Sequence, residues 1–108
     1  MDSQEQHLID VSVILKEAEP KLKPPQMYQV VIHNDDFTPM DFVVEVLRIF
    51  FFKSKAKATE IMLRVHSTGK AVCGVYTKNI AETKVSQVRA YARQHEHPLR
   101  CEMLPIDA

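Results

Sequence analysis

Three consecutive polar residues, Asn34, Asp35 and Asp36, have the most informative chemistry in this sequence. They follow a run of β-branched residues typical of a strand and precede a Thr-Pro pair typical of the start of a helix. Their side chains carry oxygen acceptors, which suit an ammonium group or a metal ion. Asn and Asp also hydrogen-bond their own backbone in turns. On the residues alone, a binding site and ordinary turn chemistry both stay open.

A histidine further along the chain could complete such a site. His66 lies four residues after Met62, so both belong to one face of the helix predicted there. The inward positions of that turn are Met62 and Val65, which puts His66 at the edge of the buried face. A lone histidine at such an edge is more often only a partly buried polar residue. Its value as a ligand depends on whether this helix packs beside residues 34–36.

Three strands and three helices are predicted to position these residues. The strands are expected at 28–33, 71–76 and 99–104, and the helices at 39 to about 52, 56 to about 67 and 81 to about 95. The order β-α-α-β-α-β indicates an α+β fold, a single small domain with one three-stranded sheet and three helices on one face. In the first strand, residues 28, 30 and 32 are expected on one face and residues 29, 31 and 33 on the other.

Local signals predict where several elements begin and end. We expect Thr38 to cap the first helix, with Pro39 as its first residue. Gly69 is expected to end the second helix in the left-handed conformation, and Gly74 to mark a bulge or a close approach of the backbone. The segment 50–52 (Phe-Phe-Phe) is too apolar to be wholly exposed, so we expect this helix end to be packed.

Residues 1–25 differ in composition from the rest and are predicted to form a mobile extension, with residues 26–108 as the core domain. A short apolar stretch (Leu8, Ile9, Val11, Val13, Ile14, Leu15) is followed by a Pro-rich, charged connector. Docking of this stretch on the domain is an open alternative.

The charge balance and the cysteines narrow the class of protein. Lys+Arg and Asp+Glu each number 14, so the formal charge is zero, which argues against a nucleic-acid-binding protein that relies on a basic surface. Cys73 and Cys101 are expected to be free buried thiols rather than a disulfide. The sequence shows neither a membrane-length apolar run nor a signal-peptide pattern. A cytoplasmic monomer is therefore expected.

Catalysis has little support in the sequence. Asp35, Asp36 and His66 form the only suggestive trio, and a metal-dependent hydrolase that uses them is an alternative. There is no nucleophile elbow, no HExxH motif and, with two glycines in the chain, no phosphate-binding loop. The histidines near Cys101 do not match a zinc spacing. We expect no enzyme activity, no cofactor and no bound metal.

At these same residues the chain resembles the ClpS family, bacterial adaptors of the Clp protease that recognise N-degrons. The resemblance covers essentially residues 24–103 and rests on PPQMYQVVIHNDDFTPMDFVVEVL, on ATEIMLRVHSTGKAVCGVYT, and on AETKV followed by YARQHEHPLRCEM. It implies an adaptor that binds proteins with an N-terminal Leu, Phe, Tyr or Trp and delivers them to the ClpA ATPase for degradation by ClpP. The alternative is a domain that binds a Clp ATPase without reading N-termini.

The resemblance also implies a two-part site. Asn34, Asp35 and His66 would hold the α-ammonium, and Asp36 would support the loop's shape. The apolar side chain would enter a pocket lined by Ile32, Thr38, Met40, Val43, Met62, Val65 and Leu99. As plain residues, Met40 and Met62 fit a core equally well, but methionine also suits pockets that accept varied apolar groups. Met40 would act as a gate against β-branched side chains, and protonation of His66 at low pH would weaken binding.

Contact with the ClpA N-terminal domain is implied for Asn79, Glu82 and Lys84. Asn79 occupies a position where the family often has an acidic residue, so at this contact the sequence departs from the family pattern. His33 stands where an apolar residue is commoner, and Phe37 where a tyrosine is often found.

Overall fold

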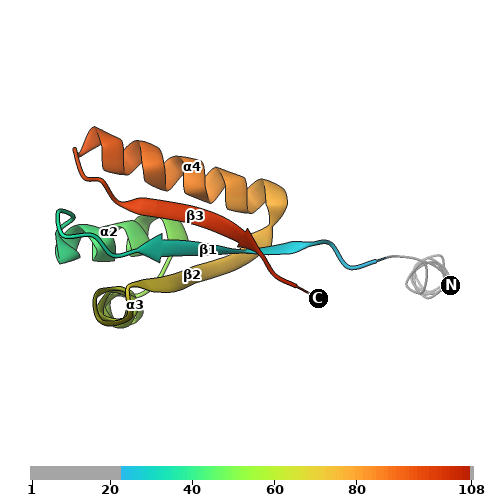
Figure 1. Ribbon diagram of the computed structural model, residues 1–108, viewed down its shortest axis with the longest axis horizontal. Coiled ribbons are helices and arrows are strands. Elements are labelled where there is room, and N and C mark those ends of the chain that lie inside the picture. Colours follow the sequence, from blue (N-terminus) through green and yellow to red (C-terminus); the bar gives the residue numbers. More distant parts are fainter. Residues whose placement is uncertain (1–22, 108) are drawn as a thin grey trace, which may run out of the picture.

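The protein is described by a computed structural model that covers residues 23–107. In chain order its elements are β1 (Met27–His33), α2 (Met40–Phe51), α3 (Lys55–Thr68), β2 (Lys70–Thr77), α4 (Lys78–Gln94) and β3 (Arg100–Pro105) (Figure 1). The predicted β-α-α-β-α-β order and the α+β class are confirmed. The prediction of a mobile extension falls mostly on residues 1–22, which lie outside the described residues.

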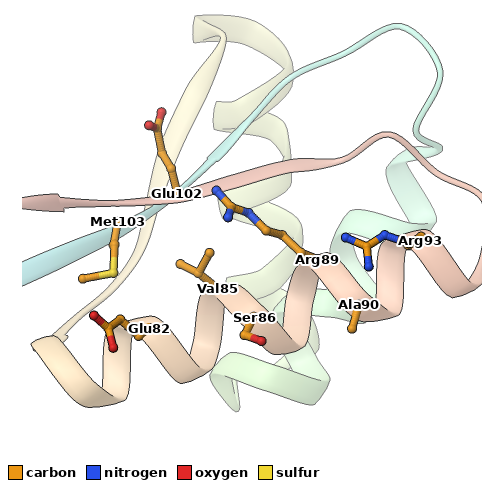
Figure 2. Close-up of a pocket in the computed structure, with 8 residues that line it drawn as sticks. All are labelled: Glu82, Val85, Ser86, Arg89, Ala90, Arg93, Glu102 and Met103. Atoms are coloured by element: carbon orange, nitrogen blue, oxygen red, sulfur yellow. The ribbon is translucent and has the colours of Figure 1, made fainter.

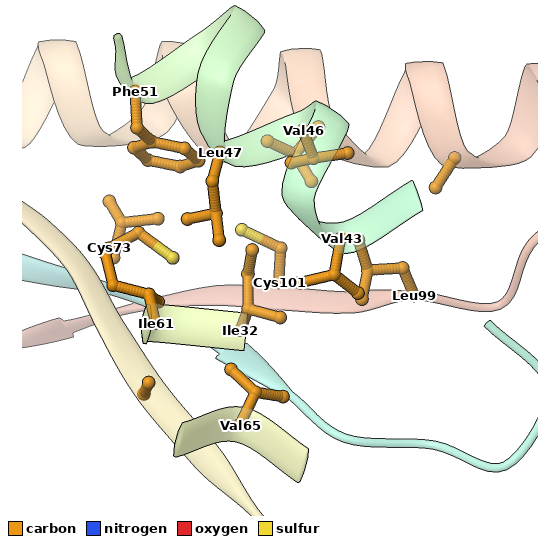
Figure 3. Close-up of a cluster of buried hydrophobic side chains, with 14 of the residues drawn as sticks. Ile32, Val43, Val46, Leu47, Phe51, Ile61, Val65, Cys73, Leu99 and Cys101 are labelled. Atoms are coloured by element: carbon orange, nitrogen blue, oxygen red, sulfur yellow. The ribbon is translucent and has the colours of Figure 1, made fainter. Parts of the chain in front are cut away.

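The three strands form one antiparallel sheet in the order β2-β1-β3, with β1 in the centre. The inward residues of β1 are Val30 and Ile32, both fully buried. They pack against buried side chains of α2, α3 and α4, so the three helices share one face of the sheet (Figure 3). The central strand therefore pairs with both other strands and contacts the shared core of the helices. Its carboxyl end leads directly into residues 34–36.

A β-bulge interrupts the pairing of β1 with β2. Val30 lies opposite Gly74 and Val31 opposite Val72, which leaves Cys73 as the extra residue. A Cβ atom built on Gly74 would lie 2.7 Å from the Cε2 atom of the Tyr76 ring, so a larger residue there would require this ring to shift. The bulge predicted from Gly74 is confirmed, and it turns Cys73 into the core.

The helix ends differ from prediction at the start of α4, which begins at Lys78 rather than at residue 81, and at both ends of α2. Pro39, not Thr38, precedes α2 as the N-cap, and its carbonyl oxygen accepts from the amides of Phe42 and Val43 at 3.1 and 3.3 Å. The αL position at the end of α2 is Phe52 (φ 54°), whose side chain is 81% exposed, whereas Phe51 is buried and Phe50 packs against the core, so the segment is not wholly exposed, as predicted, but Phe52 does not share in the packing.

The two ends of α3 show one expected and one unexpected cap. Gly69 ends the helix at φ 95°, as predicted. At the other end, the Ser54 hydroxyl accepts from the Lys57 amide at 3.1 Å, an N-cap that the sequence analysis missed although Ser is a preferred residue there.

Candidate functional site

The loop between β1 and α2 is shaped by one carboxylate. Oδ1 of Asp35 accepts hydrogen bonds from the backbone amides of Phe37 and Thr38, both at 2.8 Å. Oδ2 of Asp35 accepts from the Thr38 hydroxyl at 2.7 Å. These three bonds fold residues 35–38 into a tight loop, in which the Thr38 hydroxyl donates to Asp35 while Pro39 takes the N-cap position of α2.

Asp35 therefore has the shape-giving role that the sequence analysis gave to Asp36, and this part of the prediction is corrected. The side chain of Asp36 is exposed at the tip of the loop. Both lone pairs of Asp35 Oδ1 are used, whereas Oδ2 retains one for a further donor. The hydrogen bonds of the loop thus fix the position and orientation of the Asp35 carboxylate.

The carboxyl end of β1 is tied to the end of α3. The Asn34 amide donates to the Gly69 carbonyl at 2.8 Å, and the Gly69 amide donates to the Val65 carbonyl at 2.9 Å. His66 follows Val65 in the last turn of α3 and is exposed. The condition set for His66 is therefore met: its helix packs directly beside the Asn34 loop, although 32 positions separate the two residues in the sequence.

Four of the seven predicted pocket residues form a buried floor beneath this loop. Ile32, Val43, Val65 and Leu99 come from β1, α2, α3 and the segment before β3, and none is more than 6% exposed (Figure 3). They belong to one hydrophobic cluster. Four separate parts of the chain thus meet at this point of the core, close to the polar loop.

The other three predicted pocket residues lie nearer the surface. Met40, in the first turn of α2, is 42% exposed, and Met62 is half-buried against the core. Thr38 is half-buried and fixed by Asp35. The sequence left core and pocket open for the two methionines, and neither one is buried core. Met62 therefore packs against the aliphatic cluster and Met40 lies at the surface, and flexible thioether side chains of this kind can move aside for an apolar group.

Phe42 is a neighbour of this floor that the sequence analysis missed. It is 7% exposed, and its ring centroid lies 4.4 Å from that of His97 and 5.5 Å from that of Tyr91. These contacts hold the segment after α4, which leads to Leu99, against α2. The 3.6-residue period of apolar positions marked Val43 and not Phe42 as inward, whereas both are buried because this part of α2 is covered on two sides.

The residues implied in partner contact all lie on α4, but in different settings. Asn79 and Glu82 are exposed in its first turns. Lys84 is half-buried: its Nζ donates to the Phe50 carbonyl at 2.7 Å and lies 4.8 Å from the ring centroid of Phe52. Lys84 therefore satisfies a carbonyl at the end of α2 and covers the most exposed aromatic ring of the described chain.

His33, the departure just before the loop, contacts Glu102 of β3 through a hydrogen bond of its Nε2. Arg100 lies 3.7 Å from the same Glu102 carboxylate. His33 therefore points to the sheet face opposite the helices, so it does not line the aliphatic floor.

The two cysteines are free and buried, as predicted. Burial is the main cause that raises the pKa of both thiols, to about 12 for Cys101 and further for Cys73. Such thiols stay protonated and unreactive at neutral pH.

A separate cleft of about 520 Å³ lies between α4 and β3 (Figure 2). It is lined by charges of both signs, including Arg89 and Glu102, and Arg89 donates to the Cys101 carbonyl at 3.0 Å. Apart from Glu82 at its end, this cleft includes none of the predicted site residues.

Within residues 23–107, no group of three or more His, Cys, Asp or Glu side chains is arranged to hold a metal ion. Asp35 directs both carboxylate oxygens to its own loop, which gives no support to a metal-dependent hydrolase built on Asp35, Asp36 and His66. In the same part of the chain, the helices are all too short or too polar to cross a membrane.

Comparison with known proteins identifies the family. Residues 23–102 match the family described as ATP-dependent Clp protease adaptor protein ClpS. The ATP-dependent Clp protease adapter protein ClpS of Hydrogenovibrio crunogenus is 61% identical over 94 residues, which is 87% of this chain and 90% of that protein. The protein of the same name from Vibrio atlanticus is 58% identical over 92 residues, 85% of this chain and 87% of its own length.

A solved structure independently supports the assignment to this family. The structure of Agrobacterium tumefaciens ClpS2 bound to L-phenylalaninamide has a TM-score of 0.75 and 34% sequence identity, and the match covers 77% of this chain and all of that one. Proteins of this family are adaptors and not enzymes, so the prediction against catalysis is confirmed. The family match, the close relatives and the shared fold agree: the chain belongs to the ClpS family of ATP-dependent Clp protease adaptor proteins.

Proposed function

We propose that this chain binds proteins with a bulky apolar N-terminal residue (Leu, Phe, Tyr or Trp) and delivers them to the ClpA ATPase for degradation by the Clp protease in the cytoplasm. The observation that carries the proposal is the junction of a polar loop and an aliphatic floor, held together by the Asn34–Gly69 hydrogen bond. An N-terminal residue has the same two parts, an ammonium and an apolar side chain on one carbon. The ligand bound by the Agrobacterium tumefaciens relative, L-phenylalaninamide, combines a free amine with an aromatic ring.

The polar part of the proposed site consists of Asn34, Asp35 and His66. The amide oxygen of Asn34 and one ring nitrogen of neutral His66 accept hydrogen bonds from the ammonium. Asp35 contributes its negative charge and the remaining lone pair of Oδ2, because its other acceptor sites are filled by Phe37 and Thr38. An acetylated N-terminus has no charge and fewer donors, so the same site discriminates against it.

The apolar part consists of the buried floor and the two methionines. The floor residues are already packed, so room for a side chain comes from movement of Met40 and Met62, which are the exposed and half-buried members. A β-branched side chain places its bulk next to the ammonium, where Met40 and Thr38 stand. Thr38 cannot retreat because Asp35 holds its hydroxyl and its amide. The proposed pocket therefore favours side chains that branch further from the backbone.

The proposed contact with the ClpA N-terminal domain lies on the first turns of α4, at Asn79, Glu82 and Lys84. Ile80 is 49% exposed there and lies one helical turn before Lys84, whose ammonium lies over the Phe52 ring. The surface thus combines exposed apolar groups with polar side chains, as protein interfaces do. It is formed by different residues from the amine site, so one monomer can hold substrate and ATPase together.

The test compares a fluorescent peptide that begins with Leu with its N-acetylated twin. We expect fluorescence anisotropy to show binding of the free amine and a loss of at least tenfold on acetylation, since a charge-assisted hydrogen bond contributes roughly 1.5–3 kcal/mol. Binding of neither peptide by a folded protein that still binds ClpA would support an ATPase-binding domain that does not read N-termini.

A matched pair of variants separates the two surfaces. Asn34→Ala should reduce the preference for the free amine and leave ClpA binding unchanged. Glu82→Ala, on exposed α4, should leave peptide affinity unchanged and reduce degradation of a Leu-starting reporter by ClpA and ClpP. If Asn34→Ala bound both peptides as the unaltered chain does, the assignment of the amine site would be wrong.

A further inference from the structure

The sheet face opposite the helices carries an apolar stripe that no part of residues 23–107 covers. Val72, Val75 and Leu104 are 39%, 47% and 36% exposed, and Val31 between them is buried. The register places Val31 opposite Val72, and Gln29 opposite both Val75 and Leu104. A groove of about 270 Å³ follows this stripe; its lining includes Gln29, Val31, Arg64, Lys70, Val72 and Leu104. Figure 1 shows the three strands that form it.

The groove has a positive end. Arg64 of α3 and Lys70 of β2 line it, and Arg100 of β3 lies opposite His33 on the same sheet face. The acids near these cations are Glu102, whose carboxylate contacts His33 and Arg100, and Glu60 of α3, whose carboxylate lies 3.6 Å from Arg64; Lys70 adds a further positive charge. An occupant that combines aliphatic side chains with carboxylates would therefore bury the stripe and neutralise its rim.

The chain itself contains a segment of that chemistry in residues 1–22. Ile9, Val11, Val13 and Leu15 alternate with other residues, the period that presents apolar side chains on one side of an extended segment. Asp10, Glu17 and Glu19 lie within or just after this run. Acidic residues outnumber basic ones in residues 1–22, and because the whole chain has 14 of each, the remainder carries the opposite excess. The two parts are complementary in charge.

The chain enters the sheet at the right place for this contact. The Met27 carbonyl accepts from the Ile106 amide at 2.9 Å, which fixes the start of β1 beside the end of β3. Gln29 and Leu104, at this end of the sheet, line the groove. Residues 16–22 can span about 23 Å when extended, similar to the length of β1 at ~3.3 Å per residue. The apolar segment can therefore reach any point of the groove.

We propose that residues 8–15 dock on the apolar stripe formed by Val31, Val72, Val75 and Leu104, with the acidic side chains toward Arg64 and Lys70. The contact is intramolecular and lies on the sheet face away from the N-terminal-residue site. Because it covers apolar groups of the extension, it competes with any partner that must grip that extension. The docking itself does not depend on the proposed substrate or on the ATPase.

The test places a nitroxide label on a cysteine introduced in the extension of the full-length chain. Ser12→Cys supplies the only readily modified thiol, since Cys73 and Cys101 are buried. We expect the label to broaden the methyl NMR signals of Val72 and Leu104 strongly and to leave that of Ile49, on the exposed side of α2, nearly unchanged. Broadening spread evenly over all exposed methyl groups would overturn the proposal.

Substitutions on both sides of the contact sharpen the test. Val72→Glu should abolish the broadening at Leu104, whereas Leu63→Glu, at a more exposed apolar position on α3, should keep it. Val13→Asp in the labelled extension should also abolish it without altering the sheet. A mixed sample, with the label and the isotope on different molecules, should show no broadening. Broadening in that sample would mean that a second copy occupies the stripe, and would refute the intramolecular contact.

Discussion

Replacement of Asp35 separates the shape of the binding loop from its charge. In Asp35→Asn, the side-chain oxygen can still accept from the amides of Phe37 and Thr38, and its NH2 group can donate to the Thr38 hydroxyl oxygen. The loop is therefore kept while the negative charge is lost. In Asp35→Ala, both are lost. The difference between these two variants reports what the three hydrogen bonds contribute beyond the charge.

The size of each effect follows from the structure. Asp35→Ala removes three hydrogen bonds of 2.7–2.8 Å. At a net ~1 kcal/mol for each partly exposed bond, the free energy of unfolding falls by about 2–3 kcal/mol. For Asp35→Asn we expect a loss below about 1 kcal/mol, because neutral bonds replace charged ones. The missing charge, within about 6 Å of a bound ammonium, weakens peptide binding by roughly 1 kcal/mol, or fivefold.

Two measurements on each variant check this reasoning. Urea unfolding gives the change in stability, and anisotropy of a Leu-starting peptide gives the change in affinity. We expect Asp35→Asn to lose affinity with little loss of stability, and Asp35→Ala to lose more than tenfold in affinity. Thr38→Val, which removes one donor, should lie between the unaltered chain and Asp35→Ala in stability. Equal stability of Asp35→Ala and the unaltered chain would refute the structural role of this carboxylate.

Four further expectations follow from the same structure. Met40→Ala should increase binding of Ile- and Val-starting peptides more than it weakens Leu, and equal losses for every side chain would contradict its role as a gate. Acidification until His66 is protonated should weaken peptide binding about tenfold, as ~1.4 kcal/mol of acceptor interaction is lost, and His66→Ala should remove that pH dependence in the same titration. Burial raises the pKa of Cys101 to about 12 and that of Cys73 further, whereas unfolded thiols ionise near pH ~9. Urea denaturation should therefore show the free energy of unfolding falling as the pH rises from about 9 towards 12. The Cys73→Ala, Cys101→Ala double variant should lose most of this dependence on pH. Removal of residues 1–20 should leave peptide affinity intact and impair degradation by ClpA and ClpP, which a loss of affinity in the titration would contradict.

The sequence predicted local features correctly where the backbone conformation at a position favours one residue type. Gly69 adopts the left-handed position that ends α3, and Gly74 lies at the bulge, close beneath the Tyr76 ring. The apolar periods placed Val43 and Val65 correctly in the core. Such features depend on neighbours within one or two turns, so the local sequence contains their cause.

Predictions from the sequence failed where a side chain could make more than one set of contacts. Thr38 was expected to cap α2, but the helix begins at Met40 with Pro39 as N-cap, and the amide and hydroxyl of Thr38 both donate to Asp35. Phe52 was expected to pack with its neighbours, but the left-handed turn at this position directs its ring outward, under the Lys84 ammonium. Each outcome depends on a competition between contacts that a linear pattern does not rank.

The sequence by itself determined the α+β order, the family resemblance and the set of candidate residues, because these follow from residue types and their spacing. Only the tertiary structure decided that Asn34 and the turn bearing His66 lie together, since that depends on one hydrogen bond between the end of β1 and the end of α3. It also decided that Asp35, rather than Asp36, shapes the loop, and that Met40 is exposed while Met62 packs against a core drawn from several segments. Contacts between distant segments form when the sheet and helices pack, and no local pattern contains them.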